Sequence, residues 1–191
     1  EFTVKQGPVF SFFILADEIN RAPAKVQSAL LEAMQERQVT IGETTYKLPQ
    51  PFLVLATQNP IEQEGTYPLP EAQLDRFLFK LVVGYSTREE LNTIIDRTTR
   101  GTIITPEKVM DGEEIKRWQQ LVRQVVLAKH VQDYIARLVL ATHPGGSLAP
   151  DVTNQYIRWG ASPRGAQTIA LASKVRALLD GRYNVSFEDI R

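Results

Sequence analysis

The chain has 191 residues, of which 43% are apolar and 23% charged, and its 22 basic side chains balance 22 acidic ones. This composition is typical of one globular domain, or of a domain with a small companion, and zero net charge argues against a protein that binds polyanions over its whole surface. The absence of cysteine excludes disulfides, thiolate zinc sites and thiol nucleophiles, and two histidines are too few for a metal site without carboxylates.

The first predicted unit is a strand, an acidic pair and a helix. Residues 12–16 form a short unbroken apolar run, which is typical of a strand buried on both faces, as in a parallel sheet. Asp17 and Glu18 follow directly. After Pro23, apolar residues recur at helical spacing, which predicts an amphipathic helix that ends near Glu36.

A hairpin and a second buried strand are predicted next. Residues 38–41 and 44–48 flank a Gly-Glu pair and have the pattern of a β-hairpin. Residues 52–56 repeat the unbroken apolar pattern of the first strand. This second strand is closed by a turn-forming segment that contains Asn59.

The following segments alternate between loops and short elements. Residues 61–70 are polar and rich in turn formers, so we expect a loop, and residues 71–75 can form one helical turn. Residues 77–83 are predicted as a third strand. Thr87 and Glu90 form a capping-box pattern that predicts the start of a helix.

The rest of the chain is predicted to be helical. Apolar residues at helical spacing predict helices near 112–129 and 131–142 and a long helix that begins at Ser162-Pro163 and ends before Gly181. Residues 187–191 have the pattern of the first turn of another helix.

The charge distribution also divides the chain. Residues 1–95 hold 8 basic and 12 acidic side chains, a net charge of −4, and residues 96–191 hold 14 and 10, a net charge of +4. Two subdomains account for this pattern, and so does chance combined with intramolecular complementarity. No apolar run approaches the roughly 18 residues of a membrane-spanning helix and no leader segment is recognisable, so we expect a soluble cytoplasmic protein.

The strongest candidate site is the acidic pair Asp17-Glu18. Acidic residues at the carboxyl end of a parallel strand lie where open α/β sheets bind ligands. An aspartate there can hold magnesium through its water shell, and a neighbouring glutamate can orient or deprotonate an attacking water. The structural alternative is an acidic pair that stabilises the start of the next helix through the macrodipole.

Three further side chains are weaker candidates. Asn59 can hydrogen-bond a water or a phosphate oxygen, or it can simply form the turn before Pro60. Arg76 can stabilise charge on a transferring phosphoryl group, or it can pair with Asp75 at the surface. Arg164 lies in the first turn of the last long helix, where a cation opposes the helix dipole, and it therefore indicates an anionic partner.

The remaining candidate residues are interpreted as structural. His130 and His143 show no metal-ligand spacing, so we interpret both as structural residues. The sequence has no nucleic-acid-binding motif and no stripe of basic and aromatic residues.

The order of these features resembles that of the AAA+ ATPases. Residues 12–18 are similar to their Walker B strand. Residues 16–23, 27–34, 56–60 and 74–77 resemble more specifically the MoxR family. The resemblance covers essentially the whole chain, and these motifs are specific when they occur in this order.

The resemblance assigns a role to each matching residue. Asp17 would support magnesium and Glu18 would polarise the hydrolytic water, while Asn59 would be the sensor 1 residue. Arg76 matches the arginine finger, which reaches the nucleotide of a neighbouring subunit, and Arg164 matches sensor 2 in the helical lid.

The fold that the resemblance implies is α/β. Residues 1–86 would form the C-terminal part of the AAA+ core, and the hairpin near 38–48 matches the insertion before sensor 1. Residues 87–191 would form an all-helical lid. The sequence contains no phosphate-cradling Gly-x-x-x-x-Gly-Lys-[Ser/Thr] loop. We therefore interpret the chain as a fragment that lacks the first strand, the P-loop, its helix and the next strand; a degenerate relative that binds no nucleotide is the alternative.

The expected function follows from the same resemblance. The parent protein would use ATP and Mg²⁺ to remodel or mature a client protein complex, for example by metal or cofactor insertion, as a ring oligomer such as a hexamer. A protein with a von Willebrand factor A domain is an expected partner, and nucleic acid is not. We expect the chain alone to be inactive. The alternative function is a non-catalytic interaction module whose hairpin and lid bind a partner.

Overall fold

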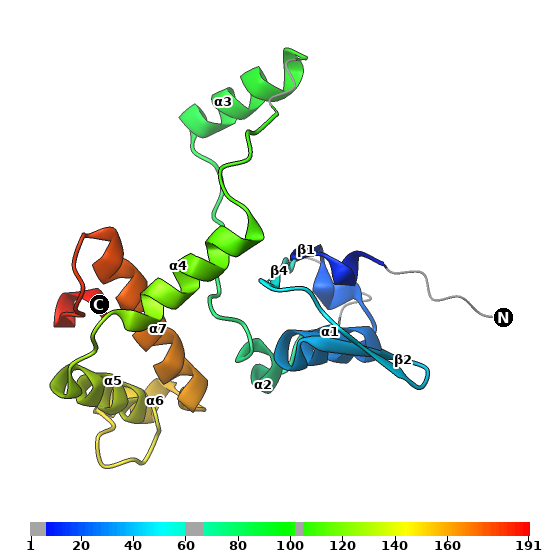
Figure 1. Ribbon diagram of the computed structural model, residues 1–191. Coiled ribbons are helices and arrows are strands. Elements are labelled where there is room, and N and C mark those ends of the chain that lie inside the picture. The colour runs from blue at the N-terminus through cyan, green and yellow to red at the C-terminus, as the bar shows by residue number, and fades with distance from the viewer. Residues whose placement is uncertain (1–6, 60–66, 102–104) are drawn as a thin grey trace. The chain divides into compact units, whose positions relative to one another are not determined.

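The computed structural model describes residues 7–59, 67–101 and 105–191 (Figure 1). Part of the loop predicted at 61–70 lies outside these residues. The described chain forms two compact units. The first runs up to Leu78 and resumes at Gly112, and the second runs from Phe79 to Asp111.

The sheet of the first unit is built from the two predicted apolar strands. Strand β1 (Phe13–Ala16) pairs in parallel with β4 (Leu53–Ala56), and Ala16 lies opposite Ala56 at their carboxyl ends. Helix α1 (Ala24–Glu36) covers one face of this sheet, and its Ala33 packs in a core cluster with Leu48, Phe52 and Val54.

The other face of this sheet is open. Its apolar side chains Phe13, Leu15, Leu53 and Leu55 are all exposed. The prediction that both strands are buried on both faces is therefore wrong for the described chain, because α1 covers only one side of the sheet.

The predicted hairpin is confirmed. Strands β2 (Gln38–Ile41) and β3 (Thr44–Lys47) pair antiparallel around Gly42, whose positive φ of 64° suits a tight turn. Helix α2 (Glu71–Leu74) forms the single helical turn that was predicted before Asp75.

The predicted strand at 77–83 is wrong. These residues have no regular structure, and Leu81, Val82 and Val83 are between 84% and 92% exposed. A strand needs a partner for its backbone N–H and C=O groups. Among the described residues β1 and β4 pair with each other, and no strand lies beside 77–83.

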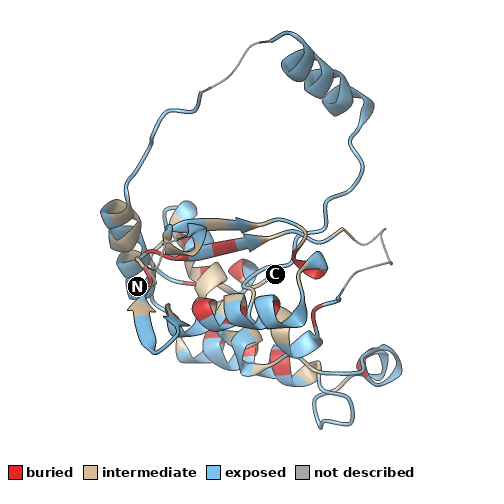
Figure 2. Ribbon diagram, turned by 90° about the vertical axis from the view of Figure 1, so that its right-hand side faces the viewer, coloured by how far each residue is buried: buried red, intermediate tan, exposed pale blue. Residues whose placement is uncertain are grey.

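The described residues of the second unit form one helix, α3 (Arg88–Thr99). The predicted capping box is present, since the Thr87 side chain accepts from the Glu90 backbone N–H and the Glu90 carboxylate accepts from the Thr87 N–H. Every residue of α3 is exposed (Figure 2).

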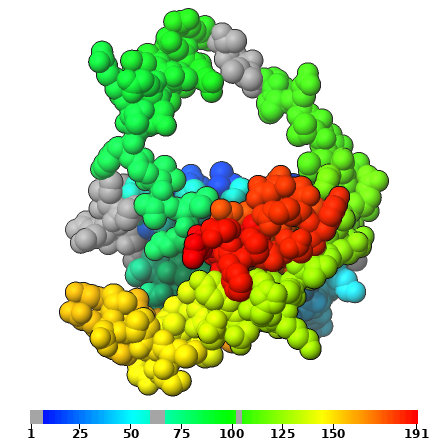
Figure 3. Space-filling model, turned by 90° about the vertical axis from the view of Figure 1, so that its left-hand side faces the viewer, coloured from blue at the N-terminus to red at the C-terminus, as the bar shows by residue number. Residues whose placement is uncertain are grey.

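The C-terminal part of the first unit is helical. Its elements are α4 (Gly112–Gln124), α5 (Lys129–Ala141), the unpredicted short helix α6 (Asp151–Tyr156), α7 (Pro163–Leu179) and the 3₁₀ turn η3 (Phe187–Asp189). Helix α7 packs against α4 and α5, and the C-terminal residues, red in Figure 3, lie against this group. Val125, Val131, Ala177 and Val185 form its buried core.

Helix α4 ends earlier than predicted because its last residues pair elsewhere. The backbone N–H of Val126 donates to Tyr183 O at 2.9 Å, and Val126 O accepts from the Val185 N–H at 2.9 Å. This short parallel bridge replaces the final helical turn that we expected up to residue 129.

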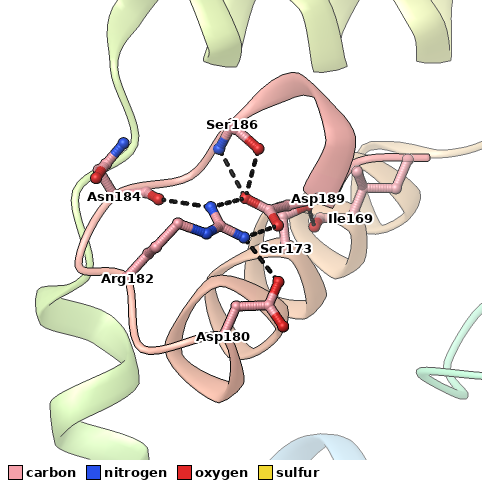
Figure 4. A network of polar contacts seen from close by, with 7 residues as sticks. All are labelled: Ile169, Ser173, Asp180, Arg182, Asn184, Ser186 and Asp189. Carbon is pink, nitrogen blue, oxygen red and sulfur yellow. Dashed lines mark hydrogen bonds and ion pairs between the residues drawn. The ribbon is translucent and has the colours of Figure 1, made fainter.

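An ion pair between the half-buried Arg182 and the buried Asp189 anchors the C-terminal turn (Figure 4). Both terminal nitrogens of Arg182 donate to the Asp189 carboxylate, and Arg182 Nη2 also donates to Asp180 at 2.9 Å. The backbone N–H and hydroxyl of Ser186 donate to Asp189 Oδ2 at 2.7 and 3.0 Å. Asp189 therefore connects η3 to the loop that follows α7.

Candidate functional site

The carboxyl edge of the β1–β4 sheet brings the first candidate residues together. Because the strands are parallel and in register at Ala16 and Ala56, the residues that follow them emerge side by side. The Thr57 N–H donates to Ala16 O at 3.1 Å, and Thr57 O accepts from the Ile19 N–H at 3.0 Å. Asp17 and Glu18 thus lie beside the segment that leads to Asn59.

The side chain of Thr57 joins this acidic pair directly. Its hydroxyl donates to Asp17 Oδ1 at 2.5 Å and accepts from the Glu18 backbone N–H at 2.8 Å. Glu18 has left-handed backbone angles, φ 49° and ψ 49°, which are uncommon for a residue with a side chain. Thr57 was not among the candidate residues selected from the sequence. Its position between an apolar strand and Asn59 was the feature that could have identified it.

The acidic pair does not serve the start of α1. That helix begins at Ala24 with Pro23 before it and has no acidic residue in its first turn. Glu18 instead makes a 3.0 Å ion pair with Arg21, and both side chains are partly exposed. The structure therefore does not support the alternative in which Asp17 and Glu18 act only by stabilising the dipole of α1.

Two buried amide side chains hold the neighbouring segments. Asn20 Nδ2 donates to the backbone O of Asn59 at 3.3 Å, and the backbone O of Asn20 accepts from the Tyr67 N–H at 2.6 Å. Gln27 Nε2, on α1, donates to Ile19 O at 3.1 Å and to Tyr67 O at 2.8 Å. These contacts hold the turn after β1 and the backbone of Asn59 in one arrangement.

Arg164 has an anionic partner, as its position in the first turn of α7 indicated. Its Nη1 donates to Asp75 Oδ2 at 3.0 Å, and the Ser162 hydroxyl donates to Asp75 Oδ1 at 2.5 Å. The Ser162 hydroxyl and the Arg164 guanidinium hold the pKa of Asp75 below its ordinary value, against the opposing effect of burial. The carboxylate is therefore ionised at neutral pH.

Arg76 has a different partner from the one that its sequence suggests. Its Nη1 donates to Leu31 O, on α1, at 3.2 Å, while the neighbouring Asp75 pairs with Ser162 and Arg164. The alternative in which Arg76 pairs with Asp75 is thus wrong. Arg76 lines a hollow of about 590 Å³ together with residues of α1, which include Glu32, and with residues of β2 and α2. Asp17 and Glu18 do not line this hollow.

The segment before α7 is fixed by side chains that follow α5. Thr142 Oγ1 accepts from the Ala161 N–H at 2.8 Å, and His143 Nε2 lies 2.9 Å from Ala161 O. A Cβ placed on Gly160 would come within 2.4 Å of the His143 ring. His143 is therefore structural, as predicted, and it helps to place Arg164.

The exposed Asp17 carboxylate is the kind of ligand that Mg²⁺ takes in proteins. Among the described residues no group of three His, Cys, Asp or Glu side chains could hold a metal by itself. Mg²⁺ retains several waters and commonly binds one or two carboxylates together with phosphate oxygens, so the exposed Asp17 carboxylate suits it.

No helix within the described ranges is both long and apolar enough to cross a membrane.

Two family models match the chain. The model described as the ATPase family associated with various cellular activities (AAA) matches residues 1–79, and that of the AAA lid domain matches residues 150–191.

Curated relatives match along the whole chain. Chaperone MoxR1 of Mycobacterium tuberculosis is 47% identical over 193 residues, which cover 100% of this chain and 50% of that protein. Protein YeaC of Bacillus subtilis is 44% identical, with 100% and 57% covered, and protein MoxR of Methylorubrum extorquens is 32% identical, with 98% and 59% covered. The chain thus spans about half the length of these relatives.

A solved structure has the same fold. The crystal structure of a proposed ATPase from Cytophaga hutchinsonii superposes with a TM-score of 0.92 at 46% sequence identity, and the match covers 98% of this chain and 57% of that one. The predicted fold class, part of an α/β core followed by a helical lid, is confirmed by this match and by the two family models.

Proposed function

The chain belongs to the MoxR family of AAA+ ATPases, and we propose that, in the full-length protein, the carboxyl edge of its β1–β4 sheet takes part in ATP hydrolysis. The observation that carries the proposal is the turn after β1, where the exposed Asp17 and the half-exposed Glu18 are held by the end of β4 through Thr57. An acidic pair at this edge is placed where open α/β sheets bind ligands.

Each side chain of this edge has a role in the proposal. Asp17 holds a Mg²⁺ ion, which when bound neutralises charge on the phosphates. Asn59, whose backbone is fixed by Asn20, orients the γ-phosphate or the water as sensor 1.

The two arginines act from other parts of the fold. Arg76 reaches the nucleotide of a neighbouring subunit in a ring, which we propose to be a hexamer. Guanidinium groups suit this role because they present several donors to phosphate oxygens. Arg164 is the lid residue that contacts the nucleotide of its own subunit, and its ion pair with the Asp75 carboxylate supports its assignment as an anion-binding side chain.

The biological role that we propose is that of a cytoplasmic chaperone that remodels or matures a client complex. The name of the Mycobacterium relative, Chaperone MoxR1, supports this class. Metal or cofactor insertion and a partner with a von Willebrand factor A domain belong to the same proposal. An interaction module without catalysis is the competing function, and loss of hydrolysis in the variant below distinguishes the two.

The test is Glu18→Gln in the full-length protein. The substitution keeps the size and hydrogen bonding of the side chain but removes the base. We expect ATP binding to be retained and turnover to fall by about 10² to 10⁴-fold. Glu107→Gln, at an exposed site in the second unit, is the matched control and should leave turnover unchanged. Hydrolysis at the parental rate by the Glu18 variant would contradict the proposal.

A further inference from the structure

Thr57 contacts the acidic turn through both its backbone and its side chain. Its backbone N–H and C=O continue the β1–β4 pairing to Ala16 and Ile19. Its hydroxyl then bonds the Asp17 carboxylate and the Glu18 backbone N–H. One residue at the end of β4 thus contacts four successive residues at the end of β1.

The Glu18 backbone needs such a restraint. A left-handed conformation is disfavoured for a residue with a Cβ, and it persists only where the surrounding structure holds it. Both side chains of the Glu18–Arg21 ion pair are partly exposed, and ion pairs at the surface restrain a backbone weakly. The contact with the Thr57 hydroxyl acts on the backbone of Glu18 itself.

The chemistry of the contact requires a hydroxyl. A single oxygen atom accepts from the Glu18 N–H and donates to Asp17 Oδ1, and only a group that is both donor and acceptor can do this. Valine has the shape of threonine but neither function. Serine keeps both functions and loses only the methyl group that restricts the rotamer.

We propose that Thr57 is a positioning residue that sets the Asp17 carboxylate and the Glu18 backbone for hydrolysis. The proposal rests on the function proposed above. The hydroxyl occupies Asp17 Oδ1, which leaves Oδ2 as the oxygen that would hold a magnesium ion. It also holds the turn from which the Glu18 side chain projects.

The first experiment needs no nucleotide. Backbone hydrogen exchange of residues 17–19 is measured in the full-length protein and in Thr57→Val, Thr57→Ala and Thr57→Ser. We expect exchange at Glu18 to rise about tenfold in the valine and alanine variants, since they lose the acceptor of its N–H, and to stay near the parental rate in the serine variant. Thr40→Val, which removes an exposed hydroxyl on β2 that pairs with Thr45, is the control and should leave these amides unchanged.

The second experiment measures hydrolysis in the same proteins. Thr57→Val and Thr57→Ala should lower kcat about 10 to 100-fold, leave KM for ATP within about twofold and raise the Mg²⁺ concentration needed for half-maximal rate, whereas Thr57→Ser and Thr40→Val should behave as the parent. A purely structural role would lower the melting temperature without this split between kcat and KM.

The outcomes separate this inference from the proposed function. If the parent does not hydrolyse ATP, the proposed function fails, and with it the catalytic part of this inference; the exchange data then decide only whether Thr57 holds the turn. If the parent hydrolyses ATP and either hydroxyl-free variant keeps the parental kcat and Mg²⁺ dependence, the inference is overturned while the proposed function stands. Unchanged exchange at Glu18 in both of those variants overturns it as well.

Discussion

The buried carboxylate of Asp189 provides a direct test of how the C-terminal turn is held. Its side chain is 1% exposed and accepts hydrogen bonds from Arg182 and from the backbone and hydroxyl of Ser186. Asp189→Asn keeps the shape of the side chain but replaces one acceptor oxygen with an NH₂ donor. That donor would face groups that are themselves donors, so the substitution removes the charge and part of the hydrogen bonding together.

The size of the effect follows from this geometry. Hydrogen bonds to a charged group contribute about 1.5 to 3 kcal/mol, so we expect Asp189→Asn to lower the free energy of unfolding by about 2 to 4 kcal/mol. For a chain of this length each kcal/mol lowers Tm by about 2 to 4 °C. Asp180→Asn is the matched control, because Asp180 contacts the same arginine but is 59% exposed, and it should cost less than about 1 kcal/mol.

The pH dependence has a defined sign. Hydrogen bonds from Arg182, followed by those from Ser186, hold the pKa of Asp189 well below its ordinary value, against the opposing effect of burial. A carboxylate whose pKa is lower in the folded state stabilises the fold above its unfolded pKa of about 4, and this contribution is lost as the pH falls further. The stability difference between parent and Asp189→Asn should therefore be full at pH 7 and shrink progressively below about pH 4.

Two measurements check this prediction. Thermal unfolding followed by circular dichroism between pH 7 and pH 2 gives the stability difference, and hydrogen exchange of the amides in η3 shows whether the loss is local. Equal destabilisation by Asp189→Asn and Asp180→Asn would refute the argument that burial makes the Asp189 contact strong. A difference that does not change with pH would refute the assigned charge.

Three further predictions concern the lid, the ring and nucleotide binding. Gly160→Ala would place a Cβ within 2.4 Å of the His143 ring, which Ala161 holds in place, and should cost about 1 to 3 kcal/mol in thermal unfolding, whereas Gly84→Ala, with open space around it, should cost far less. The Arg76→Ala variant of the full-length protein should bind ATP but hydrolyse it about 10³ to 10⁵-fold more slowly. Mixing this variant with Glu18→Gln subunits should partly restore hydrolysis. Co-assembled rings that stay inactive would show that Arg76 does not act between subunits. The 191-residue chain alone should give no saturable heat with ATP and Mg²⁺ below about millimolar concentration in calorimetry, because the phosphate-cradling loop is absent from its sequence, and micromolar binding would contradict this.

Local pattern predicted most elements of the fold because the signal for each element lies in its own residues. The apolar runs ending at Ala16 and Ala56 became β1 and β4, and the capping pattern at Thr87 marked the start of α3. In each case the signal lies within a few residues of the element. Helix α6 was missed because its six residues carry no extended apolar periodicity, and its Tyr156 is exposed.

Elements that depend on distant partners were predicted less well. The apolar segment at 77–83 has the composition of a strand, but a strand forms only where another strand accepts and donates its hydrogen bonds, and the described chain offers none there. The last turn predicted for α4 was lost in the same way, since Val126 pairs with the segment around Asn184. Composition identifies a segment that can form a strand or a helix, but the partner decides whether it does.

The charged residues of the candidate site show the same division between local and distant information. The helix dipole alone indicated that Arg164 requires an anion, and this is a property of its own first turn. The identity of that anion, Asp75, depends on a contact between residues 89 positions apart, and the adjacent Arg76 was the obvious but wrong partner by sequence. Thr57 was overlooked for the same reason, because its hydroxyl has no special signal until parallel pairing places it opposite Asp17, 40 positions away. The type of partner that a charged side chain needs can thus be inferred from its own segment, whereas the residue that supplies it is decided by the pairing of strands and the packing of helices.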